Sequence, residues 1–332
     1  MNRIRNIVSF CIVVSFATLA SADPLWLDYP GGDGVGSGKR IVLISGDEEY
    51  RTEESMPQIA KILSQHHGFE CVVLFAIDPE SGKINPDYSS NIPGLESLAS
   101  ADLMIIGTRF RSLPDDQMKH IVDYVAAGKP IMGWRTATHA FTYPDDSTSA
   151  YKSYGWSERS SDFNGGFGRQ ILGETWIAHH GNHKVESTRG IIEDPSHPIV
   201  TGIADGSIWG TSDVYEVRLP LTGDGHAIVR GQILTGMNPE DPAVQDKRND
   251  PMMPIAWTRT YQDARVFTTT MGAATDFINE PLRRMILNAT LWSLSMEDKI
   301  KPDLDVSLIG DYQPSAYGFG GFVSGKVPAD YK

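Results

Sequence analysis

Charged side chains and an imidazole follow four apolar, β-branched runs of this sequence. The polar segments are residues 45–51, 108–111, 133–139 and 271–276. Carboxylates, guanidinium groups and imidazoles transfer protons or stabilise developing negative charge. If the apolar runs are parallel strands of one sheet, their carboxyl ends meet at one edge, where open α/β sheets bind ligands. The sequence therefore predicts a single polar site at that edge.

The first polar segment contains three consecutive carboxylates, Asp47, Glu48 and Glu49. One interpretation is a general acid/base, or a carboxylate that binds substrate hydroxyl groups. The alternative is that these acids serve the following helix, since carboxylates are favoured at its positive end. That explanation accounts for one or two acids rather than three, and Glu53 and Glu54 are better placed for it. Both interpretations stay open for the group, and we take Asp47 or Glu48 as the partner carboxylate of the site.

Two arginines, Arg109 and Arg111, flank one residue at the end of the third apolar run. On an extended segment they would point the same way, which suits a clamp on a carboxylate or on sugar hydroxyls. The alternative is a pair of surface ion pairs. Because Arg109 directly follows the predicted strand, we expect it to bind substrate, together with Tyr50 and Asp276 at the ends of two other strands.

Residues 133–137 occupy the place of a nucleophile elbow, the tight strand-to-helix turn that exposes a reactive side chain. Its central residue is Arg135, which cannot be an acyl acceptor because the guanidinium stays protonated. Amidohydrolysis at this position is therefore excluded, and we expect Arg135 to stabilise an oxyanion or enolate. Thr136 offers a hydroxyl to the substrate. His139 could be an acid/base or a metal ligand, or else a helix-terminal imidazole bonded to backbone.

The densest imidazole cluster consists of His179, His180 and His183. Alternate residues of an extended segment share a face, so we expect at least one of His179 and His180 to reach the substrate. A metal site would also need His139 or a carboxylate, since adjacent histidines alone rarely bind a metal tightly. A divalent metal thus remains open, with His139, His179 and His180 as candidate ligands.

The apolar runs alternate with amphipathic segments, which predicts an α/β fold with a doubly wound, mainly parallel sheet. Unbroken apolar runs at 40–45, 71–77, 103–107 and 131–134 indicate buried strands, and helical spacing appears at 56–63 and 118–125. Short strands follow at 184–192, 214–219 and 226–230, then a β-hairpin around 260–264 and a helix from Pro281. We predict one domain over residues 23–300, with residues 301–332 as a C-terminal strap rich in glycine and aromatic side chains.

The first 22 residues have the pattern of a signal peptide: two arginines, an apolar stretch and the small residues Ala20, Ser21 and Ala22. An uncleaved anchor is the alternative, but the stretch is short for a membrane span. We therefore expect a periplasmic or extracellular protein with no stable membrane insertion after cleavage. Beyond the leader only Cys71 remains, in an apolar run, which predicts a buried thiol and no intrachain disulfide.

The formal net charge is -13 and no basic run occurs. Nucleic acid is therefore not an expected partner, and a neutral small molecule fits better. Nothing in the composition specifies an oligomeric state.

Taken together, several segments resemble the ThuA-like (trehalose-utilisation) family, and in particular its secreted members from planctomycete-type bacteria. The segments are residues 41–51, 135–141, 179–183, 197–199, 254–257, 265–267 and 317–322, with the helix through Trp292. The resemblance covers almost the whole chain after the leader. It implies the flavodoxin-like fold of class I glutamine amidotransferases, here without the nucleophilic cysteine, and disaccharides or their keto forms as substrates.

Several ThuA-like proteins carry a histidine after the glycine of the late strand, where it can join the elbow histidine around a metal. This chain has Ala273 there, so a metal would have to recruit Asp276, His179 or His180. We therefore expect acid/base chemistry on a disaccharide or keto-sugar, by an isomerase or hydrolase that uses His139, Arg135 and one of the early carboxylates. The alternatives are a non-catalytic carbohydrate-binding or scaffold protein and a metal-dependent hydrolase.

Overall fold

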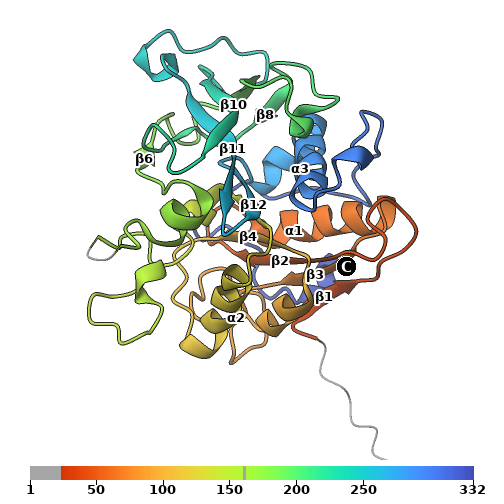
Figure 1. The fold of residues 1–332 in the computed structure, drawn as a ribbon, viewed down its shortest axis with the longest axis vertical. Coiled ribbons are helices and arrows are strands. Elements are labelled where there is room, and N and C mark those ends of the chain that lie inside the picture. The colour runs from red at the N-terminus through yellow and green to blue at the C-terminus, as the bar shows by residue number, and fades with distance from the viewer. Residues whose placement is uncertain (1–23, 160–161) are drawn as a thin grey trace, which may run out of the picture.

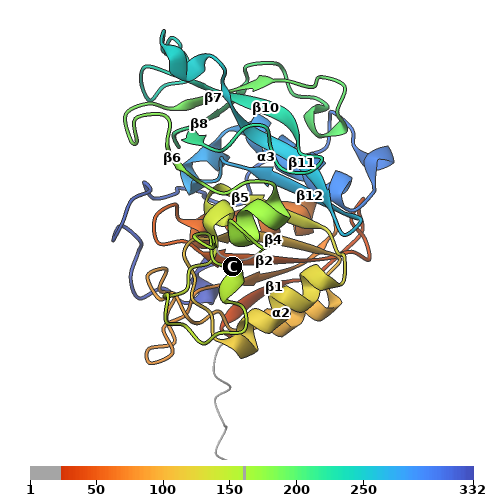
Figure 2. The same ribbon diagram turned by 60° about the vertical axis from the view of Figure 1, so that its left-hand side comes forward.

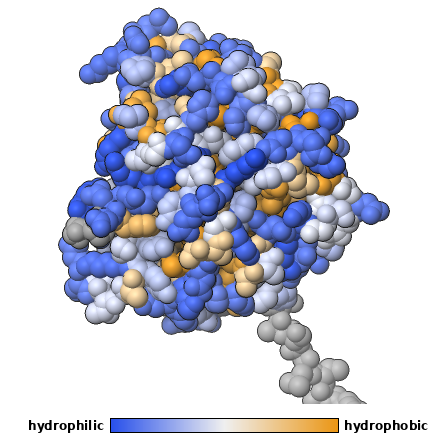
Figure 3. Space-filling view, in the orientation of Figure 1, coloured by the Kyte–Doolittle hydropathy of each residue, from blue (hydrophilic) through white to orange (hydrophobic). Residues whose placement is uncertain are grey.

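The computed structural model describes residues 24–159 and 162–332 (Figure 1). The predicted signal peptide, residues 1–22, lies outside the described residues. Within the described ranges, no helix is both long and apolar enough to cross a membrane. The face seen in Figure 3 is largely hydrophilic, with apolar side chains scattered over it.

A ten-stranded sheet in the order β1-β3-β2-β4-β5-β12-β11-β10-β7-β8 forms the centre of the molecule (Figure 2). The parallel strands are β2 Arg40–Gly46, β3 Glu70–Leu74, β4 Leu103–Thr108, β5 Ile131–Trp134 and β12 Ala264–Thr269. Their order is that of a flavodoxin-like doubly wound fold, so the predicted α/β class is confirmed. Chain order reverses between β2 and β4, and ligands bind at such a point.

Antiparallel strands extend the sheet on both sides. On one edge lies β1 Trp26–Tyr29, which the sequence did not predict. On the other side follow β11 Met253–Tyr261, β10 His226–Ile233, β7 Thr188–Ile192 and β8 Ile208–Gly210. The predicted hairpin is present, since β11 and β12 pair around residues 262–263. The strand predicted at 214–219 is shorter: β9 Tyr215–Glu216 pairs with β6 Ala178–His179 in a separate two-stranded sheet.

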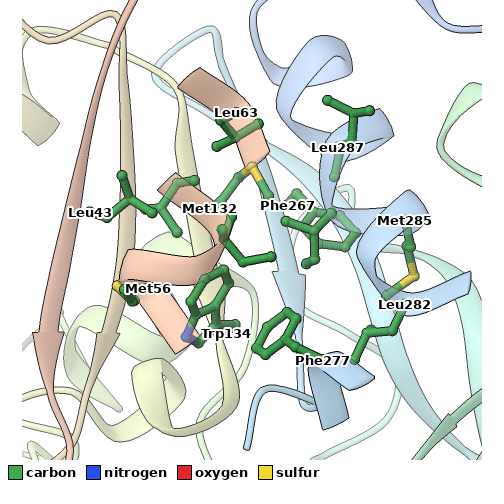
Figure 4. Close-up of a cluster of buried hydrophobic side chains, with 14 of the residues drawn as sticks. Leu43, Met56, Leu63, Met132, Trp134, Phe267, Phe277, Leu282, Met285 and Leu287 are labelled. Carbon is green, nitrogen blue, oxygen red and sulfur yellow. The ribbon is translucent and has the colours of Figure 1, made fainter. Parts of the chain in front are cut away.

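The helices α1, α2 and α3 cover the sheet. Because successive side chains of a strand point to opposite faces, the residues of one strand contribute to two separate cores. From β2, Ile41 and Leu43 pack with α1 Thr52–Lys61 and α3 Glu280–Ser293 (Figure 4). The alternate residues Val42 and Ile44 pack on the opposite face with α2 Asp115–Ala126. A strand buried on both faces is therefore apolar without alternation. Cys71 is part of the first core and fully buried, as predicted.

The chain after α3 crosses the carboxyl edge of the sheet in irregular conformation, apart from short 3₁₀ turns at Glu297–Lys299 and Pro328–Tyr331. It is tied down by hydrogen bonds: the Tyr312 hydroxyl donates to Ala274 O at 2.8 Å, and the Ser315 N–H donates to Glu54 Oε2 at 2.7 Å. Glu53 and Glu54 lie in the first turn of α1, where acids suit the helix dipole.

Candidate functional site

A pocket with about 310 Å³ of free space opens at the carboxyl ends of β2, β4 and β5. This is the place where the strand order reverses and where such folds bind ligands. The side chains that line it come from the three strand ends and from the loops that lead to β6 and β9: Glu49, Tyr50, Arg109, Phe110, Arg135, Thr136, His139, Trp176, His179 and Tyr215.

Left-handed backbone marks each of the three strand ends. Arg51, Phe110 and Arg135 have φ values of 61°, 50° and 46°. Such a conformation costs a residue other than glycine of the order of 1–3 kcal/mol, and it is retained where surrounding structure enforces it. Arg135 lies at the sharp turn from β5 into the 3₁₀ helix Arg135–His139, so the elbow has the predicted position.

A hydrogen-bond chain determines which nitrogen of His139 carries the proton. The Tyr215 hydroxyl donates to the Arg135 carbonyl at 2.8 Å, so its only proton is used there. Thr138 Oγ1, at 2.8 Å, must then donate to Tyr215, and it can only accept from His139 Nδ1 at 3.3 Å. This assigns the proton to Nδ1 and leaves His139 Nε2 as a free lone pair, since no described residue is hydrogen-bonded to Nε2.

The environment of His139 keeps the imidazole neutral. Its ring is surrounded by Phe110, Trp176 and Tyr215, with centroids 4.9, 5.5 and 6.4 Å away. Burial in this aromatic wall is the main reason why the pKa of His139 lies well below its usual value, and the nearby Arg109 cation lowers it further. His139 therefore offers an unprotonated nitrogen at neutral pH.

Beside this aromatic wall, a second group of residues forms an ionic wall around Asp213. His179 Nδ1 lies 2.7 Å from Asp213 Oδ2, and His183 Nδ1 lies 3.0 Å from Oδ1. The other nitrogen of His183 is 3.1 Å from Glu49 Oε1. The hydrogen bond to Asp213 raises the pKa of His179, in the direction opposite to that of His139. The pairing of β6 with β9, which aligns His179 with Tyr215, holds the two walls together.

The buried guanidinium of Arg135 also binds the ionic wall. It donates from Nη2 to Asp213 Oδ1 at 2.9 Å and to the Tyr50 hydroxyl at 2.8 Å, and from Nη1 to the Asp213 and Thr270 carbonyls at 2.8 Å. Only its Nε–H has no partner among the described residues. Arg135 therefore holds Tyr50 and Asp213 in position.

The carboxylate that lines the pocket is Glu49. Asp47 is fully buried: its Oδ1 accepts the N–H groups of Glu49 and Tyr50 at 2.8 and 3.0 Å, and its Oδ2 accepts the Thr136 hydroxyl. Asp47 thus shapes the turn and does not line the pocket. Burial raises the pKa of Glu49, and Asp47 adds to this, although Arg109 and His183 oppose it.

Three other residues predicted for the site lie outside the pocket wall. Glu48 is held between Arg109 and Arg111 by ion pairs to both. His180 Nε2 is hydrogen-bonded to the Arg248 carbonyl at 2.8 Å. The buried Asp276 accepts the backbone N–H groups of residues 212, 272 and 273, each at 3.0 Å, and so holds two loops together. Tyr50, Arg109, Thr136, His139 and His179 do line the pocket.

A metal could be held within the ionic wall. The ligand atoms of His179, His183 and Asp213 all lie within 4.8 Å of one another, and no other such group occurs in the part of the chain that is described. Two imidazoles and a carboxylate are a suitable ligand set for zinc. Against this, Arg135 already compensates the charge of Asp213. Of the ligands proposed from sequence, His179 belongs to this group, and His139 and His180 do not.

Sequence reasoning missed Trp176, Asp213 and Tyr215. All three lie in loops or in a two-residue strand, where no hydrophobic period identifies the inward face. His183 belongs to the histidine cluster of the sequence, but strand alternation cannot show which way its side chain points, because the chain turns at residues 180–184.

Comparisons with known proteins give the chain's family and several similar solved structures. The solved structures that match include a putative ThuA-like protein from Parabacteroides merdae, 15% identical, with a TM-score of 0.49 over 77% of this chain and 90% of that one. A β-galactosidase from Rahnella sp. R3 is 11% identical, with a TM-score of 0.42 over 78% of this chain and 32% of that one. A search of proteins with curated functions found no match. The family model described as ThuA, trehalose utilisation, matches residues 40–293, so the chain belongs to the ThuA family.

Proposed function

We propose that this protein acts on a disaccharide or keto-sugar by acid/base chemistry, as an isomerase or hydrolase. Its membership of the ThuA family supports a role in carbohydrate utilisation. The observation that carries the proposal is the hydrogen-bond chain from Tyr215 through Thr138, which leaves a neutral His139 with Nε2 free in the pocket. A second imidazole with a raised pKa, His179, lies in the adjoining ionic wall. Neighbouring groups whose pKa values are pushed apart are typical of an acid and a base that work together.

In the proposed reaction, Nε2 of His139 takes a proton from the substrate. With a keto-sugar this proton comes from the carbon beside the carbonyl, and the electron pair moves onto the carbonyl oxygen. Glu49, whose pKa is raised, or protonated His179 then gives a proton to that oxygen. His139 completes an isomerisation by giving its proton to the former carbonyl carbon, while the neighbouring hydroxyl loses its proton to the same acid group. In a hydrolysis, His139 would instead take the proton from a water molecule that attacks the anomeric carbon, and the acid would protonate the departing glycosidic oxygen. Arg135 acts as a positioning residue for Tyr50 and Asp213. No thiol takes part, because Cys71 is buried in the core.

The test measures turnover of disaccharides and of their keto derivatives, with binding measured by calorimetry. We expect His139→Gln to lower kcat by about 10²–10⁴-fold, since that is the usual contribution of a general base, and to leave Kd nearly unchanged. Glu49→Gln should lower kcat less. His180→Gln is the matched control, because His180 lies outside the pocket wall. Full turnover by His139→Gln would overturn the assignment.

A metal-dependent hydrolase is the second candidate, and the cluster of His179, His183 and Asp213 favours it. Elemental analysis of protein purified without chelator separates the two mechanisms. About one zinc ion per chain, lost in His183→Ala together with activity, would favour the metal-dependent mechanism. Full activity in metal-free protein would favour acid/base chemistry by the side chains alone.

A non-catalytic carbohydrate-binding protein would use the same aromatic wall of Phe110, Trp176 and Tyr215 to hold a sugar. It predicts that sugars bind without turnover in the wild type. We also propose export to the periplasm or outside the cell, which rests on the pattern of residues 1–22. Mass spectrometry of the exported protein should then find Asp23 at its N-terminus.

A further inference from the structure

An exposed aromatic side chain stands beside the pocket on the C-terminal strap, residues 301–332. The Phe319 side chain is 64% exposed. The Arg109 guanidinium carbon lies 4.9 Å from its ring centroid and 4.5 Å from that of Phe110. Arg109 and Phe110 both line the pocket. The Arg109 guanidinium therefore contacts both the wall of the pocket and the ring of Phe319.

The strap residue before Phe319 is firmly anchored to the site. The Gly318 N–H donates to the Glu49 carbonyl at 2.7 Å, and the Arg51 guanidinium donates to the Gly318 carbonyl. Tyr317 stacks on Tyr50 with ring centroids 5.2 Å apart. Gly318 has a φ of 145°, which other residues rarely adopt. Phe319 is thus exposed on a backbone that is held in place, and a fixed platform loses little conformational entropy when a ligand binds.

The size of the pocket and the place of the strap define what this ligand would be. The free space of the pocket includes solvent at its open mouth, so the pocket is small and suits one sugar ring better than two. The strap lies beyond residue 293, where the match to the family model ends. It therefore lies outside the part of the chain that the family model matches, and it is a suitable element to set specificity.

We propose that Phe319, backed by Arg109, forms an outer sugar subsite that stacks on the C–H face of the second ring of a disaccharide while the first ring occupies the pocket. This inference rests on the proposed carbohydrate function. A pyranose presents several C–H groups on one face, and an aromatic ring removes them from water. The strap then selects disaccharides over monosaccharides.

Calorimetry with the full-length protein and a panel of disaccharides, trehalose among them, tests the subsite, each disaccharide being paired with its component monosaccharide. We expect Phe319→Ala to weaken disaccharide binding about 3- to 10-fold and to change monosaccharide binding less than twofold, since aromatic contacts contribute on this scale. Phe319→Trp should retain the preference. Val323→Ala, also exposed on the strap, is the matched control.

The outcomes distinguish a failure of the proposed subsite from a failure of the proposed carbohydrate function. Equal effects of Phe319→Ala on both sugar classes, or no effect on either, would overturn the subsite and leave the proposed function intact. If no sugar in the panel, including the keto derivatives, binds the wild-type protein, the carbohydrate function itself fails and the subsite fails with it.

Discussion

The two walls of the pocket present the same kind of side chain, an imidazole, in opposite environments. His139 lies among Phe110, Trp176 and Tyr215, and its burial lowers its pKa. His179 is hydrogen-bonded to Asp213, which raises its pKa. The difference shows that one fold can hold two imidazoles with opposite pKa shifts side by side, because aromatic burial and a carboxylate partner shift the same group in opposite directions.

Removing the carboxylate of the ionic wall should have the largest effect on stability. In Asp213→Asn the buried Arg135 loses its charge partner, and an uncompensated buried charge costs about 3–5 kcal/mol of unfolding free energy. Urea denaturation measures this loss. Asp303→Asn, at an exposed position of the strap, is the control and should change stability by less than about 0.5 kcal/mol. A loss as small as the control's would mean that the backbone carbonyls alone hold Arg135.

On the aromatic wall, the tautomer of His139 can be changed without touching the ring. Thr138→Val removes the acceptor of the Nδ1 proton, while Tyr215 keeps its bond to the Arg135 carbonyl. We expect a loss of about fivefold in kcat, since one hydrogen bond contributes about 1 kcal/mol, with KM nearly constant. Nitrogen NMR shifts of His139 should show mixed tautomers, and Thr138→Ser should restore both readouts. An unchanged tautomer in Thr138→Val would show that the chain does not control it.

The regular half of the molecule could be predicted from sequence because its signals are local. The unbroken apolar run of β2 and the amphipathic spacing of α1 and α2 identify the parallel sheet, and this sheet gives the edge on which Arg109, Arg135 and His139 lie. The choice among Asp47, Glu48 and Glu49 could not be made. Asp47 bends back onto the backbone of the next residues, and such a turn has no period in the sequence.

The ionic wall was unpredictable for a different reason. Asp213 lies in a loop, where an acid usually faces water, and it becomes the centre of the site only because Arg135 is 78 residues away in sequence and beside it in space. Long-range pairing of this kind leaves no trace in the spacing of one sequence. The clustered histidines of residues 179–183 were the only local signal of this wall.

The smallest expected effect is the opposite pH dependence that the two imidazoles give to stability. His179 has a raised pKa in the folded state, so its contribution is complete below the unfolded value of about 6.5 and is lost as pH rises through the folded pKa. His139 has a lowered pKa, so it stays unprotonated in the folded protein. As pH falls below about 6.5, the unfolded chain binds a proton that the folded protein does not bind, and the stability of the fold declines. Differences between variants and wild type isolate each imidazole from the other histidines.

Urea denaturation between pH 5 and 8, which spans the unperturbed histidine pKa of about 6.5, should therefore separate the walls. We expect His179→Gln to flatten the decline of stability on the alkaline side and His139→Gln to flatten the decline on the acidic side. His226→Gln is the control, because His226 is exposed and pairs only with Asp194 at the surface. If both pocket variants changed the same side of the profile, the two walls would not hold their imidazoles in opposite protonation states, and the assignment of base and acid would lose its physical basis.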